Sequence, residues 1–218
     1  MTSPTSSTAV VIGATGLVGR ECVKLLVARP EFGRVIALAR RALPDDVESP
    51  KLRTVLVDFD RLDEQREVFR ASHVFCALGT TIKTAGSRER FRQVDFGYPM
   101  RAAELALAAG ARHFLLVSSV DASSSSRAFY LRVKGELEDA VLALGFPSVT
   151  VVRPSILLGD RNEFRLGEVI AARLSWAFPQ TYRAVHVRDV ARTLVDAAVE
   201  DWPGARMIEN PEIVANAR

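Results

Sequence analysis

The chain alternates short, continuous runs of apolar residues with longer stretches of helical composition. Six apolar runs occur before Pro154: TAVVIG, RVIALA, LRTVLVD, HVFCALG, HFLLVSS and SVTVVRP. Strands that are buried on both faces of a parallel sheet have this continuous pattern. The stretches between them, such as ECVKLLVAR and YPMRAAELALAAG, are rich in helix formers. The alternation predicts an α/β fold, a doubly wound parallel sheet with right-handed crossovers.

The segment after Pro154 has a different pattern. It contains a polar loop LGDRNEFRLG, an apolar stretch EVIAARLSWAF, a short strand AVHV and a helix DVARTLVDAAVE. We interpret these as a small cap on the carboxyl edge of the sheet, because they are too few for a second domain. We therefore expect a flexible tail over residues 1–8 and one domain over residues 9–218, with cap elements after about residue 154.

Composition and charge narrow the class of protein. The 218 residues are 48% hydrophobic, which is enough to bury one full core. The formal net charge is +3, from 29 Lys and Arg against 26 Asp and Glu. These charges interleave, and SRERFR at residues 87–92 is typical of a solvated helix face. We therefore expect no nucleic-acid partner.

The cysteines and histidines suggest no metal site. Cys22 and Cys76 lie far apart in apolar surroundings, which fits neither a disulfide framework nor metal-ligand spacing. The three histidines border apolar runs, where a structural role is expected: His73, His113 and His186. The N-terminal MTSPTSST lacks the features of a signal peptide, and no apolar run reaches the ~18 residues of a membrane span. We expect a soluble, cytoplasmic protein.

A glycine-rich turn follows the first predicted strand. VVIGATGLVGRE places Gly13, Gly16 and Gly19 at the opening of the first helix. Glycine permits the tight turn and lets backbone N–H groups approach a pyrophosphate at the helix N-terminus. A P-loop would need Gly-Lys-Ser/Thr, whereas Arg20 and Glu21 follow Gly19. The pattern predicts dinucleotide binding in a Rossmann-type domain.

The end of the second strand indicates which dinucleotide. NAD enzymes normally place Asp or Glu there, about 20 residues further on, to bind the ribose 2′-hydroxyl. Here the sequence is ALARRALP, with Arg40 and Arg41 and no acid. Guanidinium groups suit a phosphate, so the pattern favours NADP(H) over NAD(H). The alternative is that both arginines are simply solvated.

The chain also contains a candidate proton-transfer set. LLVSSVDA brings Ser118 and Ser119 to the carboxyl edge of the sheet, where ligands bind in this architecture. FYLRVKGELE then places Tyr130 and Lys134 four positions apart on one face of a helix. Serine, tyrosine and lysine in this order, behind a glycine-rich first turn, resemble the short-chain dehydrogenase/reductase superfamily.

The resemblance is closer to one atypical branch, which includes the Tat-interactive oxidoreductase family. It rests on segments that run in order from residue 10 to about residue 191: GATGLVG, ARR, CALGTT, VDFGYP, LLVSS, FYLRVKGELE, VVRPSILLGDR and VHVRDVA. RPSILLG and VHVRDVA are also similar to the extended, sugar-nucleotide-modifying branch, but the chain after Pro154 is short for that branch. The spacing Gly-x-x-Gly-x-x-Gly also departs from the classical branch.

The resemblance implies a specific chemistry. A tyrosine phenol in water, with a pKa of about 10, is a poor acid or base at pH 7. Lys134 can stabilise the phenolate of Tyr130, and in such families the lysine also binds the nicotinamide ribose. Ser119, or Ser118 in its place, would position the substrate oxygen. The cofactor supplies the hydride.

Further cofactor contacts are implied by the resemblance. Asp58, at the end of the third strand, could accept a hydrogen bond from the adenine amino group, or it could merely end the strand. Leu78 and Leu157 could instead be core residues, and Arg165 a solvated loop charge. The implied contacts are Thr15, Leu17, Val18, Leu78, Gly79, Leu157 and Arg165.

Two functions stay open from the sequence. The first is an NADP(H)-dependent reductase of a small carbonyl compound, and the alternative is an NADP(H)-binding redox sensor or regulatory protein that acts through partners with little turnover. A homodimer or a protein partner fits either function. We also expect the polar loop between Gly159 and Gly167 to close over the cofactor, with Trp176 and Phe178 forming a pocket wall or a dimer contact.

Overall fold

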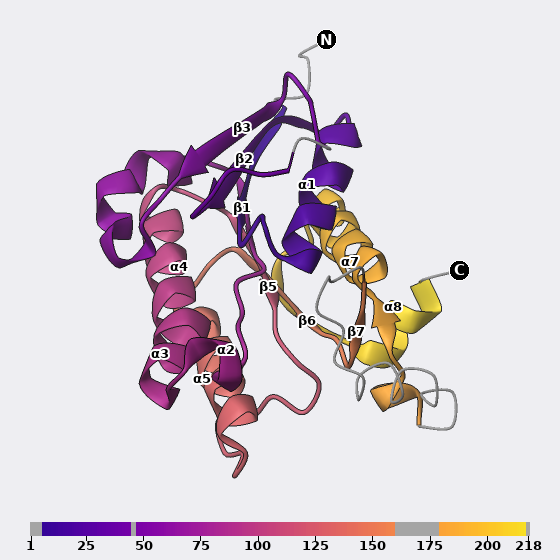
Figure 1. The fold of residues 1–218 in the computed structure, drawn as a ribbon. Coiled ribbons are helices and arrows are strands. Elements are labelled where there is room, and N and C mark those ends of the chain that lie inside the picture. Colours follow the sequence, from indigo (N-terminus) through magenta and orange to yellow (C-terminus); the bar gives the residue numbers. More distant parts are fainter. Residues whose placement is uncertain (1–5, 45–46, 160–178, 217–218) are drawn as a thin grey trace.

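The structure is a computed structural model that describes residues 6–44, 47–159 and 179–216. Seven strands form one sheet in the order β3-β2-β1-β4-β5-β6-β9, and all neighbouring strands are parallel (Figure 1). The strands are β1 (Ser7–Ile12), β2 (Phe32–Ala39), β3 (Leu52–Leu56), β4 (His73–Cys76), β5 (His113–Val117), β6 (Ser148–Arg153) and β9 (Gly204–Glu209). The first six coincide with the predicted runs, so the doubly wound α/β fold is confirmed.

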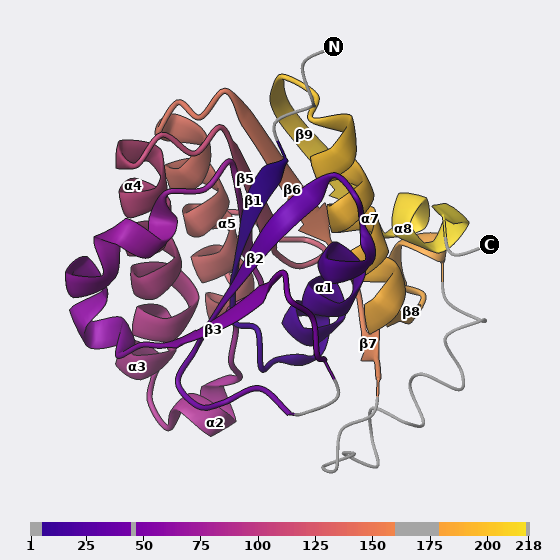
Figure 2. The same cartoon turned by 90° about the horizontal axis from the view of Figure 1, so that it is seen from above.

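Helices cover both faces of this sheet (Figures 1 and 2). On one face lie α1 (Leu17–Ala28) and α7 (Val187–Glu200), which pack on each other. The other face is covered by α3 (Arg88–Arg92), the π-helix η2 (Gln93–Gly97), α4 (Tyr98–Ala108) and α5 (Phe129–Ala143). The shorter elements are η1 (Phe59–Phe69), α2 (Ile82–Ala85), β7 (Leu157–Leu158), η4 (Gln180–Tyr182), β8 (Val185–His186) and α8 (Asn210–Asn216).

Side-chain alternation along β1 explains the continuous apolar runs. Ala9 and Val11 belong to the core under α1 and α7, whereas Val10 and Ile12 belong to the core under α4. All four side chains are fully buried. Because successive residues of a strand point to opposite faces, a strand between two helical layers needs an apolar residue at every position.

The elements after Pro154 occupy two different places. β7 and β8 follow β6 and pair with each other in parallel, apart from the main sheet. In contrast to the predicted cap, α7 belongs to the helical layer on α1, and β9 extends the main sheet beside β6. The apolar face of α7, which includes Val190 and Leu194, completes the core on that side.

The predicted lid cannot be placed in this fold. The loop beyond Gly159, including Arg165, Trp176 and Phe178, lies outside the described residues.

Candidate active site

The sheet changes direction between β1 and β4. From β1 the chain proceeds outward through β2 to β3, then crosses back to β4 on the other side of β1. The carboxyl ends of these two strands form the switch point at which ligands bind in open α/β sheets. The glycine turn follows β1 at this point, and Leu78 and Gly79 follow β4.

Two of the three glycines are required by packing in this turn. Gly13 has φ +81°, and a Cβ on it would lie 2.7 Å from the carbonyl carbon and oxygen of Ala77. A Cβ on Gly19 would lie 2.2 Å from the carbonyl oxygen of Gly13. Both separations are far below van der Waals contact. The glycines therefore let the turn, the start of α1 and the end of β4 meet closely.

The N-terminus of α1 is suited to an anion. Its cap residue, Gly16, has no side chain to bond the first backbone N–H groups, and the first turn, beginning with Leu17 and Val18, contains no acidic residue. These N–H groups and the positive end of the helix dipole face the switch point, next to Thr15. The glycine turn and the N-terminus of α1, which together we call the glycine cradle, therefore fit the pyrophosphate of a dinucleotide.

A buried ion pair lies next to the loop after β4. Lys134 Nζ on α5 is 2.8 Å from Asp95 Oδ1, and the backbone N–H of Thr80 donates to Asp95 Oδ2 at 2.9 Å. A Cβ on Gly79 would lie 3.5 Å from Asp95 Oδ1 and 3.6 Å from Lys134 Nζ. The loop after β4 thus lies next to the glycine turn and also next to Lys134, the lysine of the predicted Tyr-Lys pair.

Asp95, the partner of Lys134, lies in a segment of unusual backbone. It lies in η2, a π-helical turn between α3 and α4, and is fully buried. Single π-turns inside α-helices are rare and occur frequently at functional sites. The sequence analysis did not select Asp95, because QVDFG has no local signal that separates a buried carboxylate from a solvated one.

Lys134 retains its charge despite its burial. Only 4% of the residue is exposed, and burial alone would lower its pKa. The Asp95 carboxylate, together with Tyr130, outweighs that effect and raises the pKa of Lys134 above its ordinary value. Tyr130 is half-buried, with its ring 5.8 Å from that of Phe91. Tyr130 and Lys134 both lie on α5, one helical turn apart, and their pairing stays a prediction.

The two serines differ in their surroundings. Ser118 is 5% exposed, and its Oγ has no hydrogen-bond partner among the described residues. Ser119 is half-buried. The loop that follows them packs tightly on α5, since a Cβ on Gly135 would lie 2.2 Å from the carbonyl carbon of Ser123. Gly135, which the sequence analysis did not select, therefore helps to hold the serine loop against the helix of Tyr130.

The remaining predicted contacts are spread along the same edge. Arg40 and Arg41 follow β2, are exposed and form no ion pair with another described residue. The Asp58 side chain accepts a hydrogen bond from the backbone N–H of Asp60 at 3.0 Å, which caps η1. Leu78 packs against the core under α4. Leu157 is 36% exposed, so it is not a plain core residue.

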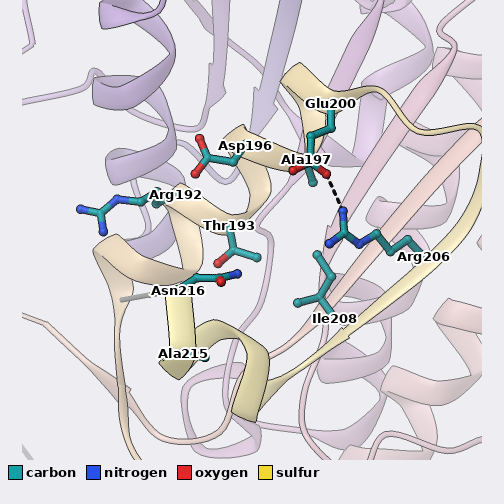
Figure 3. Close-up of a pocket in the computed structure, with 9 residues that line it drawn as sticks. All are labelled: Arg192, Thr193, Asp196, Ala197, Glu200, Arg206, Ile208, Ala215 and Asn216. Carbon is teal, nitrogen blue, oxygen red and sulfur yellow. Dashed lines mark hydrogen bonds and ion pairs between the residues drawn. The ribbon is translucent and has the colours of Figure 1, made fainter. Parts of the chain in front are cut away.

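A separate hollow of about 440 Å³ lies between α7, β9 and α8 (Figure 3). Its rim is polar, and Arg206 and Glu200 form an ion pair across it at 2.6 Å. None of the predicted site residues is among the described residues that line it: Arg192, Thr193, Asp196, Ala197, Glu200, Arg206, Ile208, Ala215 and Asn216. This hollow is therefore not the candidate active site.

Comparison with known proteins agrees with the glycine cradle. Residues 13–201 match the family described as NAD(P)H-binding. The chain belongs to this NAD(P)H-binding family. Protein HTATIP2 of Rattus norvegicus is 37% identical over 210 residues, covering 94% of this chain and 86% of the relative. The resemblance to the Tat-interactive branch of short-chain dehydrogenase/reductases is thereby confirmed.

A second relative corrects the predicted location. Protein FMP52, mitochondrial, of Meyerozyma guilliermondii is 41% identical over 219 residues, covering 94% of this chain and 90% of the relative. FMP52 proteins of two further yeasts are also named mitochondrial. The expectation of a cytoplasmic protein, which rested on the missing signal-peptide pattern and on the lack of a long apolar run, is therefore wrong. Within the described residues, no helix has the length and apolarity to cross a membrane.

Solved structures support the same fold. The UDP-glucose 4-epimerase of Thermotoga maritima, solved with UDP-glucose, aligns with a TM-score of 0.71 over 93% of this chain and 76% of the epimerase. The two chains are 16% identical. The likeness therefore concerns the Rossmann-type fold alone.

Proposed function

We propose that this protein is an NADP(H)-dependent oxidoreductase of the short-chain dehydrogenase/reductase type that acts on a small carbonyl compound. The observation that carries the proposal is the buried Lys134, which pairs with Asp95 at 2.8 Å and lies one turn of α5 from Tyr130. A lysine held in this way beside the loop of Gly79 serves a proton-transfer site better than a fold-stabilising role, because buried charges are costly.

Each side chain has a role in the proposed reaction. The hydroxyl of Tyr130 gives a proton to the carbonyl oxygen during reduction and takes it back in the reverse direction. Lys134 stabilises the phenolate and binds the ribose, and Asp95 keeps that lysine protonated. The unpartnered Oγ of Ser118, or the hydroxyl of Ser119, donates to the same carbonyl oxygen. The bound dinucleotide supplies the hydride.

The proposal predicts a preference between the two dinucleotides. NADPH should bind at least about tenfold more tightly than NADH, a difference of about 1.4 kcal/mol, because Arg40 and Arg41 can pair with its 2′-phosphate. Calorimetry on the parent chain and on the double variant Arg40→Ala, Arg41→Ala checks this. Equal affinities in the parent chain, or an unchanged preference in the variant, would contradict it.

The catalytic role is tested by removing the hydroxyl of Tyr130. Tyr130→Phe should abolish NADPH oxidation with a panel of small aldehydes and ketones while leaving NADPH affinity nearly intact. Lys134→Ala should reduce both. Tyr98→Phe is the matched control, because it also removes a tyrosine hydroxyl. That hydroxyl donates to Asp60 Oδ1 at 2.5 Å, where α4 packs against η1.

The same experiment separates the two functions. Undiminished turnover in Tyr130→Phe would exclude this tyrosine as the acid. Tight NADPH binding without turnover in the parent chain, across the whole panel, would favour the alternative of an NADP(H)-binding regulatory protein.

A further inference from the structure

A second polar cluster lies at the opposite, amino edge of the sheet. His73 and His113 are the first residues of β4 and β5 and are partners in register. Phe75 and Leu115, two positions further along each strand, lie in the core under α1 and α7, so the histidines face the same side. Both are 1% exposed. Two buried imidazoles therefore lie side by side where α7 ends.

Asp201 is the third member of this cluster. It follows α7 in the left-handed conformation, with φ +48°. Its Oδ1 is 3.5 Å from His73 Nε2 and 3.2 Å from His113 Nδ1. The three atoms all lie within 4.8 Å of one another. Asp201 Oδ2 is occupied by Arg112 Nε at 2.9 Å, which leaves Oδ1 for the histidine side.

The other nitrogen of each ring has a hydroxyl partner. Ser72 Oγ donates to the carbonyl of Thr8 at 3.0 Å, so it must accept the hydrogen bond at 2.9 Å from His73 Nδ1. His113 Nε2 lies 2.9 Å from Thr150 Oγ1, which can accept in the same way. Hydrogen bonds of this kind fix the tautomer of metal-binding histidines and direct the lone pair to the opposite nitrogen.

The nitrogens that face Asp201 have no hydrogen-bond partner among the described residues: His73 Nε2 and His113 Nδ1. Both rings are buried and face Asp201, and the carbonyl of Ala198 also faces the His73 ring.

We propose that His73 Nε2, His113 Nδ1 and Asp201 Oδ1 bind a divalent transition-metal ion of the Zn²⁺ class, with water in the fourth position. Tetrahedral Zn²⁺ with bonds of about 2.0–2.1 Å places its ligand atoms about 3.3 Å apart. The two separations from Asp201 Oδ1, 3.2 and 3.5 Å, match that edge, and the two nitrogens lie within 4.8 Å of each other. The Asp201 side chain is 28% exposed, so the carboxylate side of the cluster borders solvent. The ion would tie the end of α7 to β4 and β5.

Zn²⁺ titration of the chelator-treated full chain tests the site. We expect one Zn²⁺ per chain by calorimetry and a rise in Tm that Mg²⁺ does not produce, because imidazole ligands do not suit Mg²⁺. Asp201→Asn should weaken Zn²⁺ binding at least about tenfold. Even the loss of a residue that only hydrogen-bonds to a metal ligand weakens metal binding by about that factor. Asparagine also keeps the left-handed backbone, so this variant should fold.

Two control variants isolate the ligand role. Arg112→Gln breaks the same Arg112–Asp201 ion pair but keeps all three ligands, so it should bind Zn²⁺ as tightly as the parent chain or more tightly. His186→Asn removes the third histidine, which is exposed and caps α7, and should leave binding unchanged.

A spectroscopic measurement needs no variant. Co²⁺ bound to the parent chain should give the intense visible bands of a four-coordinate ion. Equal Zn²⁺ affinity in the parent chain and Asp201→Asn, binding lost equally in Arg112→Gln, or the weak spectrum of six-coordinate Co²⁺ would each overturn the proposal. These outcomes are independent of the proposed oxidoreductase activity, which lies at the other edge of the sheet.

Discussion

At the scale of single residues, Asp95 decides the state of Lys134. A fully buried lysine without a partner tends to release its proton, since burial disfavours the charged form. The carboxylate at 2.8 Å reverses this tendency and raises the pKa of Lys134. The proton-transfer set proposed from the sequence is therefore incomplete without a carboxylate from a different helix.

We predict that Asp95→Asn destabilises the fold by about 3–5 kcal/mol, the range for breaking a buried ion pair. Lys134→Met should have a similar effect, and the double variant should lose less than the sum. Urea unfolding checks this cycle. Simple additivity of the two losses would show that the residues do not stabilise each other.

The same variant has a predicted pH dependence. Because the folded pKa of Lys134 is raised, its stabilisation is present below the ordinary lysine value of 10.5 and is lost as the pH rises through the folded pKa. Asp95→Asn removes the largest interaction that opposes burial, so the pKa of Lys134 falls in the variant relative to the parent chain. The stability deficit of the variant should therefore shrink as the pH rises toward and past 10.5. A deficit that does not change with pH would contradict the assignment.

The sequence could reveal Tyr130 and Lys134 because their four-residue spacing is local and places them on one helix face. It could not reveal Asp95 or the histidine cluster. Asp95 lies in a π-helical turn and meets Lys134 of a different helix, and His73 meets His113 through strand pairing. Such contacts between distant parts of the chain have no local signature.

At the scale of elements, the junction of β1, α1 and β4 depends on Gly13 and Gly19, because neither position has room for a Cβ. We predict that Gly19→Ala lowers NADPH affinity at least about tenfold, because its Cβ would collide with the Gly13 carbonyl and displace the turn. Calorimetry measures the affinity, and thermal unfolding measures the accompanying loss of stability.

Gly110→Ala is the matched control for this junction. Gly110 has φ +88°, but a Cβ on it would meet no atom within 4 Å. Its replacement should destabilise the fold by about 1–2 kcal/mol through backbone strain and leave NADPH affinity unchanged. Equal affinity losses in both variants would mean that Gly19 acts through stability and not through the turn.

The strands were predicted correctly where both faces of the strand are buried. β4 reads HVFC and is buried at every position, so its apolar run identified it. β9 reads GARMIE, lies at the sheet edge and buries one residue fully, so it left no apolar run. α7 was predicted as a helix, but periodicity does not state which surface a helix covers. Its placement on α1 required the tertiary structure.

At the scale of the whole molecule, Arg153 joins three elements. Its Nη2 lies 2.5 Å from Glu138 Oε2 on α5, and its Nη1 lies 2.9 Å from Glu209 Oε1 on β9. Glu138 is almost fully buried. This network connects α5, the helix of Tyr130, to β9, the last strand of the sheet.

We predict that Arg153→Leu destabilises the fold by about 3–5 kcal/mol, because Glu138 would be left buried and unpaired. Glu138→Gln in that background should restore part of the loss. The control Arg206→Leu removes the exposed Arg206–Glu200 pair and should cost less than about 1 kcal/mol. Urea unfolding compares the three, and equal losses for Arg153→Leu and Arg206→Leu would contradict the prediction.

The packing of α1 on α7 has a consequence for synthesis of the chain. Val23 and Leu26 of α1 are covered by α7 residues such as Leu194. Translation produces α1 among the first elements and α7 near the end, so the apolar face of α1 stays uncovered on the ribosome until almost the whole chain has emerged. A premature stop before residue 187 therefore yields an exposed apolar helix and an aggregation-prone product, not a shorter working domain.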